Sequence, residues 1–286
     1  MMNVSGVTFA KLLNSELDCL KISNPFCEAT ISFQGAQVLE FFSKTQNKSL
    51  LWLSDLNNYS AGKAIRGGIP LCFPWFGASK ENKDFPAHGF ARNLIWSLLD
   101  ITVDAMGHHI VFELNDRAET RQYWDFAFSL QMKIHFGEQL ELELTLTNQD
   151  QVELECEFVW HSYFPAMTKT AQIHGLVQTE YIDQLDGNIL KIQQDQQILF
   201  TQEEDRIYPQ TAGKFVLEQN VNQRIFIEST AQSAVIWNPW IEKAKRLSDV
   251  RDDAWQDFVC LETGQIGSEK LQLRSDEKIH YHFKIN

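Results

Sequence analysis

The sequence predicts an all-β protein, built as a large antiparallel β-sandwich with few short helices. In four segments apolar side chains alternate with polar ones, which is the period of a strand with one buried face: 109–114, 140–148, 224–229 and 280–285. Short polar turn clusters such as TQNKS, LDGN and QTAGK separate the candidate strands. Helical spacing is scarce, so strands should dominate the fold.

The clearest strand is LELELTLTN at residues 140–148. Its four leucines face one side, whereas its glutamates and threonines face the other. The other three segments add aromatic and β-branched residues, which favour strands. Only residues 243–249 and 252–258 are candidates for short helices.

No fixed-period repeat, low-complexity linker or long charge run interrupts the chain. We therefore expect residues 1–286 to form a single domain. Antiparallel sheets can leave one face in water, and a broad concave face of that kind suits sugar binding.

The composition narrows the possible partners and the compartment. A formal net charge of −13, with no block of basic residues, argues against nucleic acid. No apolar run approaches the roughly 20 residues that span a bilayer, and the N-terminus lacks the pattern of a signal peptide. The five scattered cysteines are expected to be free thiols. We expect a cytoplasmic protein that is a monomer or weak dimer.

Two basic segments could hold an anion. Arg66 precedes the rigid apolar run GGIPLCFPWFG, and FPAHGFARN contains both His88 and Arg92. Each arginine could instead pair with a surface carboxylate. Together, beside glycines that would let a ligand approach the backbone, they suit an anion clamp.

Three further segments carry groups for acid–base chemistry. His161 lies among aromatic residues in FVWHSYFPA, where it could equally be a hydrogen-bonded core histidine. Glu262 follows the apolar run FVCL, where burial would raise its pKa toward the range of a general base. Asp205 in EEDRIYP is a weaker candidate.

Other chemistries find less support. His280 and His282 share one strand face, but Lys284 shares it too, so a solvated polar face is favoured over a metal site. His108 and His109 point to opposite sides of any strand, which argues against a chelate. There is no phosphate-binding glycine loop and no nucleophile elbow. We therefore expect no cofactor and no metal.

The segments RGGIPLCFPWFG, PAHGFARN, HSYF, DRIY, WNPW and FVCLETG occur in this order between about residues 66 and 264. Together they resemble the aldose 1-epimerase (mutarotase) superfamily, and most of all its hexose-6-phosphate mutarotase branch, also called glucose-6-phosphate 1-epimerase. The resemblance implies a galactose mutarotase-like supersandwich with its active site in a cleft across one sheet. It also implies the interconversion of α and β anomers.

The resemblance also assigns roles to residues. His161 and Glu262 match the catalytic pair, Asp205 matches a carboxylate that contacts sugar hydroxyls, and His88 matches a histidine near the substrate.

Arg66 and Arg92 match positions that hold the sugar phosphate. Some members have glutamine where this chain has Ala87, so this chain departs from the family pattern at one side chain.

These residue types fit the chemistry independently. Ring opening needs a base for the anomeric hydroxyl proton and an acid for the ring oxygen. Glu262 is expected as the base and His161, titrating near neutrality, as the acid, with the roles reversed on closure. Alternatives are a mutarotase for unphosphorylated aldoses, a non-catalytic carbohydrate-binding protein on the same fold, and a glycosidase that uses Glu262 and Asp205.

Overall fold

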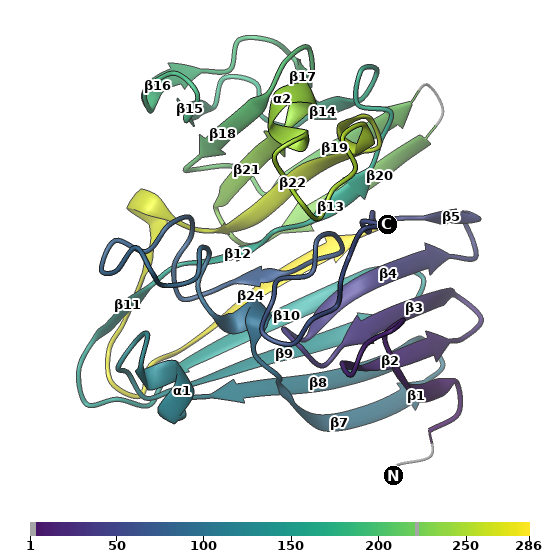
Figure 1. The fold of residues 1–286 in the computed structure, drawn as a ribbon, viewed down its shortest axis with the longest axis vertical. Coiled ribbons are helices and arrows are strands. Elements are labelled where there is room, and N and C mark those ends of the chain that lie inside the picture. Colours follow the sequence, from purple (N-terminus) through teal and green to yellow (C-terminus); the bar gives the residue numbers. More distant parts are fainter. Residues whose placement is uncertain (1–3, 221–222) are drawn as a thin grey trace.

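The computed structural model describes residues 4–220 and 223–286, and every count below refers to these residues. The chain forms two large β-sheets and two smaller ones, and every pairing between named strands is antiparallel. Figure 1 shows the strands that dominate the molecule and the few short helices beside them. The expectation of an antiparallel all-β fold with few short helices is confirmed.

The largest sheet has nine strands and includes the segments with the clearest alternation. In spatial order its strands are β17 (Gln197–Leu199), β14 (Gln172–His174), β19 (Lys214–Asn220), β20 (Gln223–Ser229), β24 (Lys278–Ile285), β10 (Leu140–Asn148), β9 (Phe128–Phe136), β8 (Gly107–Asn115) and β7 (Ser97–Asp104). In β10 the four leucines are buried as predicted, and Glu141 on the opposite face is exposed. The predicted strands at 109–114, 224–229 and 280–285 lie within β8, β20 and β24.

The second sheet has eight strands and carries the candidate site. Its strands are β16 (Ile189–Ile192), β15 (Glu180–Asp183), β18 (Glu204–Tyr208), β21 (Ser233–Asn238), β22 (Phe258–Gln265), β12 (Phe158–Trp160) and β6 (Leu71–Cys72), with β13 (Tyr163–Pro165) also paired to β22. All eight residues of β22 are buried. The apolar run FVCL and the Glu262 that follows it therefore lie in one fully buried strand.

An N-terminal sheet packs against the nine-stranded sheet. Its strands are β1 (Val7–Lys11), β2 (Asp18–Ser23), β3 (Cys27–Ser32), β4 (Gln37–Ser43) and β5 (Lys48–Ser49), drawn in purple in Figure 1. Phe33 after β3 meets Phe112 of β8 edge-on at 5.2 Å between ring centroids. One hydrophobic cluster contains residues of both sheets, from Leu20 in β2 to Ile285 in β24. A two-stranded sheet of β11 (Leu154–Cys156) and β23 (Leu271–Leu273) completes the set.

The helices differ from the sequence prediction. They are α1 (Ala118–Arg121), α2 (Trp240–Ala244) and the 3-10 turns η1 (Ala91–Asn93), η2 (Ala254–Gln256) and η3 (Gly267–Glu269). The helix predicted at 243–249 begins and ends earlier, because α2 directly follows Pro239 and residues 245–246 already form a turn. The helix predicted at 252–258 is only the turn η2, since Phe258 already belongs to β22.

Two further expectations can be checked against the fold. Each of the five cysteines is free, as predicted, and the structure also buries all five. Among the described residues, no helix has the length and apolar character needed to cross a membrane.

Candidate active site

A break between β12 and β13 places a histidine beside a glutamate. Both short strands pair with β22, through Trp160 opposite Thr263 and through Tyr163 opposite Cys260. His161 lies between them, outside the strand ladder, and its backbone N–H donates to the carbonyl of Pro70. The side chain can therefore turn toward the facing strand.

The result is a close buried pair. His161 Nδ1 lies 3.3 Å from Oε1 of Glu262, which projects from the middle of β22. The Glu262 side chain is 1% exposed and that of His161 is 8% exposed. The two residues that the sequence singled out for acid–base chemistry are thus adjacent.

Burial governs the charge of Glu262. It raises the pKa of the Glu262 carboxyl well above its ordinary value, and the nearby Asp205 adds to the shift. Arg92 and Arg66 oppose it but do not outweigh burial. The predicted upward shift is confirmed, and it favours the protonated form of Glu262.

His161 differs from the sequence prediction in its titration. Burial lowers the pKa of its imidazole well below the ordinary value, and His88, Arg92 and Arg66 lower it further. The expectation that His161 titrates near neutrality is therefore wrong. A low-dielectric site disfavours both charges at once, so Glu262 holds the single proton that the pair shares.

Several polar atoms in this region are buried without a hydrogen-bond partner in the described part of the chain. They include His161 Nδ1, Glu262 Oε2 and Arg92 Nε. A buried polar atom that stays unpaired costs about 1–3 kcal/mol, so such groups are rare in folded proteins. Their concentration here indicates a site for a polar ligand.

His88 joins the pair from a separate loop. Its ring centroid lies 5.5 Å from that of His161, and its Nδ1 accepts a hydrogen bond from the Gly77 backbone N–H. That bond leaves the proton on Nε2, which can donate to a ligand. Burial, Arg92 and Arg66 lower the pKa of His88 to about 3, so the ring is neutral at physiological pH.

The loop of His88 depends on a close approach of two backbones. Gly89 bridges to Phe73 with φ of +72°, and a Cβ at Gly89 would collide with the Phe73 carbonyl. Only glycine fits such a position.

The side chain of Arg92, which follows His88 in the same segment, has some of its donors hydrogen-bonded and one without a partner among the described residues. Arg92 Nη2 donates to the backbone carbonyl of Ala87 at 3.0 Å, whereas its Nε is unpartnered. Since the contact at Ala87 is to the main chain, the missing glutamine side chain does not prevent it.

The side chain of Arg66 is held on two sides. Its Nε lies 3.1 Å from Oδ2 of Asp249, and its Nη1 donates to the hydroxyl of Tyr163 at 3.0 Å. Sequence reasoning missed both partners. Tyr163 lies in the quoted HSYF segment, so its place beside His161 gave a signal, whereas Asp249 is separated from Arg66 by 183 positions and gave none.

The glycines after Arg66 serve another purpose than the one predicted. Gly67 and Gly68 have φ of +113° and +63°. A Cβ on Gly67 would collide with the backbone of Trp52 and Leu53, and one on Gly68 with that of Val38. The expectation that these glycines admit a ligand to the backbone is wrong, because other backbone segments of the protein fill that space.

Asp205 reaches the site from β18, which is separated from β22 by β21. Its carboxylate accepts a hydrogen bond from Gln184 and lies 3.4 Å from Lys243 Nζ on α2. Burial raises the pKa of Asp205, and Lys243 opposes that shift. Sequence reasoning missed Lys243, which also lies 5.7 Å above the ring of Trp237 in the quoted WNPW segment.

One group of donors could hold a metal ion. The ligand atoms of His161, Cys260 and Glu262 lie within 4.8 Å of one another. Burial raises the pKa of the Cys260 thiol well above its usual value, so the sulfur is protonated when no ion is bound. Cys260 and Glu262 would both have to lose a proton before they could bind a metal.

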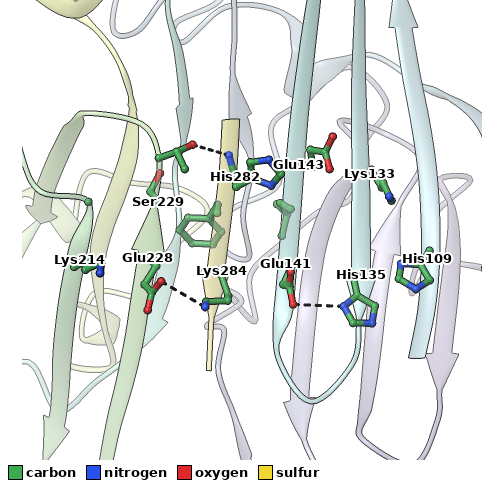
Figure 2. A pocket seen from close by; sticks show the side chains of 14 residues that line it. His109, Lys133, His135, Glu141, Glu143, Lys214, Glu228, Ser229, His282 and Lys284 are labelled. Carbon is green, nitrogen blue, oxygen red and sulfur yellow. Dashed lines mark hydrogen bonds and ion pairs between the residues drawn. The ribbon is translucent and has the colours of Figure 1, made fainter. Parts of the chain in front are cut away.

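A separate pocket lies on the nine-stranded sheet. Its volume is about 460 Å³, and Figure 2 shows charged side chains from neighbouring strands around it. Its charged groups pair with one another, as in Lys284 with Glu228 at 3.4 Å and His135 with Glu141 at 3.6 Å. His282 and Lys284 both line it, which confirms that they share one face. His109 also lines it whereas His108 is buried on the other side, as predicted.

Comparison with known proteins gives a consistent result. The model of the family described as aldose 1-epimerase matches residues 18–286. A "putative glucose-6-phosphate 1-epimerase" of Escherichia coli K12 is 31% identical over 269 residues, which cover 93% of this chain and 88% of the relative.

Solved structures agree with the sequence matches. The crystal structure of a "putative mutarotase" from Salmonella typhimurium has a TM-score of 0.91 at 28% identity, covering 99% of this chain and 94% of the other. Galactose 1-epimerase from Lactobacillus acidophilus NCFM shares the fold, with a TM-score of 0.73 at 12% identity over 98% of each chain.

Proposed function

Because the chain belongs to the aldose 1-epimerase family, we propose that it is an isomerase that interconverts the α and β anomers of a hexose 6-phosphate, such as glucose 6-phosphate. The observation that carries the proposal is the buried pair of His161 and Glu262 beside two arginines. The pair supplies proton transfer and the arginines supply binding for an anion.

The chemistry follows from what the anomeric centre needs. A hemiacetal ring opens when the anomeric hydroxyl loses a proton and the ring oxygen gains one. In the proposed mechanism Glu262 accepts the first proton and His161 donates the second. After rotation about the bond between C1 and C2, the same transfers run in reverse and close the ring on the other face.

This cycle needs the shared proton on His161 rather than on Glu262. The distance of 3.3 Å between Nδ1 and Oε1 is short enough for the proton to pass between them once a small rotation aligns the groups. A sugar hydroxyl that donates to the Glu262 carboxylate stabilises its charged form, which shifts the proton in the required direction. The neutral His88 can then donate from Nε2 to a sugar oxygen.

The arginines support a phosphorylated substrate. The protein carries a formal net charge of −13, so an anion needs a local positive field to bind. Arg66 and Arg92 both lower the pKa of His161 and oppose the raised pKa of Glu262, which supports a positive field at the proposed acid and base. The unpartnered Nε of Arg92 is a donor that a phosphate oxygen would satisfy.

One observation favours the alternative of an unphosphorylated aldose. Arg66 already donates to Tyr163 and pairs with Asp249, so its charge is partly neutralised without a ligand. In that case Arg66 would have a structural role and the sugar alone would be recognised, with Asp205 as a contact for its hydroxyls.

The two possibilities differ in the substrate preference of the enzyme. Anomer exchange is measured by polarimetry or NMR, starting from α-glucose 6-phosphate and from α-glucose. We expect a higher kcat/KM for the phosphorylated sugar. Arg92→Ala should raise KM for glucose 6-phosphate by roughly 10- to 150-fold, as expected for loss of a hydrogen bond to a charged group, and should affect glucose far less.

The matched control is Arg117→Ala, which removes an exposed arginine that pairs with Glu119. It should leave both kinetic constants unchanged. Equal kcat/KM for the two sugars would favour the unphosphorylated substrate. Sugar binding with no acceleration of either exchange would support a non-catalytic carbohydrate-binding protein instead.

A further inference from the structure

We propose that Tyr163 is a positioning residue. It holds Arg66, which is proposed to bind the phosphate, in a fixed position relative to His161, the proposed general acid. Its hydroxyl accepts a hydrogen bond from Arg66, and its ring stacks on the His161 imidazole. The inference rests on the proposed function, because it concerns how the two ends of that site are held in one geometry.

The first link holds Arg66 at its main chain and at two nitrogens of its guanidinium, Nε and Nη1. Its guanidinium lies between Asp249 at 3.1 Å and Tyr163 at 3.0 Å. Its backbone N–H donates to Asn57 Oδ1, and its carbonyl accepts from Asn57 Nδ2, each at 2.8 Å. Both the main chain and the charged end are therefore set before any ligand arrives.

The second link fixes His161. The rings of His161 and Tyr163 are 4.9 Å apart between centroids and inclined by only 9°, which is a stacked pair. The ring of Tyr163 also packs against those of Trp52 and Phe258, with centroids 5.9 Å and 5.5 Å away. Tyr163 is 1% exposed, so this packing leaves its ring little freedom to move.

Tyr163 thus contacts both ends of the site through different parts of its side chain. The hydroxyl holds the arginine and the ring holds the histidine. A rigid link of this kind lets a phosphate bound at Arg66 place the sugar ring at a fixed distance from the acid–base pair, which lowers the cost of reaching the transition state. The same residue therefore affects both substrate selection and proton transfer.

The two parts can be separated by two substitutions. Tyr163→Phe removes the hydroxyl and keeps the ring, so the ratio of KM for glucose 6-phosphate to KM for glucose should rise by about tenfold or more. Tyr163→Leu removes both the hydroxyl and the ring. For each sugar, kcat of Tyr163→Leu should therefore be about 2- to 12-fold lower than kcat of Tyr163→Phe, which is the loss expected for one aromatic stacking contact.

Tyr208→Phe is the matched control. Tyr208 is another fully buried tyrosine, and its hydroxyl donates to Gln193 rather than to a residue of the site. Its substitution should leave the KM ratio unchanged. The proposal is overturned if Tyr163→Phe leaves that ratio as it is in the wild type.

A failure of the proposed function can be recognised separately. If the wild-type protein does not act on glucose 6-phosphate, the affinity for inorganic phosphate is compared by calorimetry in the wild type and Tyr163→Phe. Weaker phosphate binding in the variant still supports the link to Arg66. Equal affinity overturns the link whatever the substrate is.

Discussion

Replacing Glu262 by glutamine should abolish catalysis while leaving the fold intact. The substitution keeps the size of the side chain but removes the proton acceptor. One positioned proton transfer contributes about 10²- to 10⁴-fold, so kcat for anomer exchange should fall by that factor. Stability should change little, because the amide has the same buried surroundings as a protonated carboxyl, and one oxygen of Glu262 has no partner to lose.

If His161 and Glu262 instead form a structural salt bridge, Glu262→Gln should lower the stability of the protein. Breaking a buried ion pair on one side costs about 3–5 kcal/mol. For a chain of this size, 1 kcal/mol shifts the midpoint of thermal unfolding by about 2–4 °C, so Tm would fall by about 6–20 °C.

Calorimetry and an NMR exchange assay on the same samples decide between the two. Glu141→Gln on the exposed face of β10 is the control for a general effect of lost charge. A Glu262→Gln protein with near wild-type exchange, or one with a large loss of Tm, would refute the reasoning.

Three further predictions concern stability. Burial raises the pKa of Glu204 to about 7 although Arg206 lies beside it, so the folded state holds a proton that the unfolded state loses above about pH 4.5. The free energy of unfolding should therefore fall by up to about 3 kcal/mol between pH 4.5 and 7. Thermal unfolding of Glu204→Gln should lack this dependence on pH. Gly89→Ala should reduce both stability and activity, because its Cβ would collide with the Phe73 carbonyl; unchanged unfolding in denaturant would contradict this. Leu144→Ala should cost about 2–5 kcal/mol in the same assay with kcat retained, since it opens a core cavity at β10 of the nine-stranded sheet, whereas His161 and Glu262 lie on the eight-stranded sheet.

Local patterns predict the strands and single out His161 and Glu262 as candidates, whereas their proposed role as an acid–base pair rests on the family resemblance. The alternation in 140–148 is a property of neighbouring residues, and the structure buries its leucines in β10. His161 and Glu262 were recognisable because each interrupts an apolar or aromatic run, where an unpaired polar group is expensive. Their adjacency depends on both β12 and β13 pairing with β22, which no local pattern reveals.

Long-range contacts explain most of what the sequence did not predict. The partners of Arg66 come from distant segments, and Lys243 reaches Asp205 from another element. Gly67 and Gly68 indicate a close approach to the backbone, but a sequence cannot tell whether a ligand or another strand approaches. The low pKa of His161 likewise results from burial and from charges that only the fold brings together.

The central position of β22 has a consequence for how sequences of this kind can vary. Glu262 lies opposite Val235 of β21, and its neighbours in β22 pair with β12 and β13 on the other side. A slip of one residue would turn the carboxylate to the opposite face of the sheet, away from His161. We therefore expect insertions and deletions among relatives to fall in the connecting loops and to spare 258–265, whatever sugar each relative prefers.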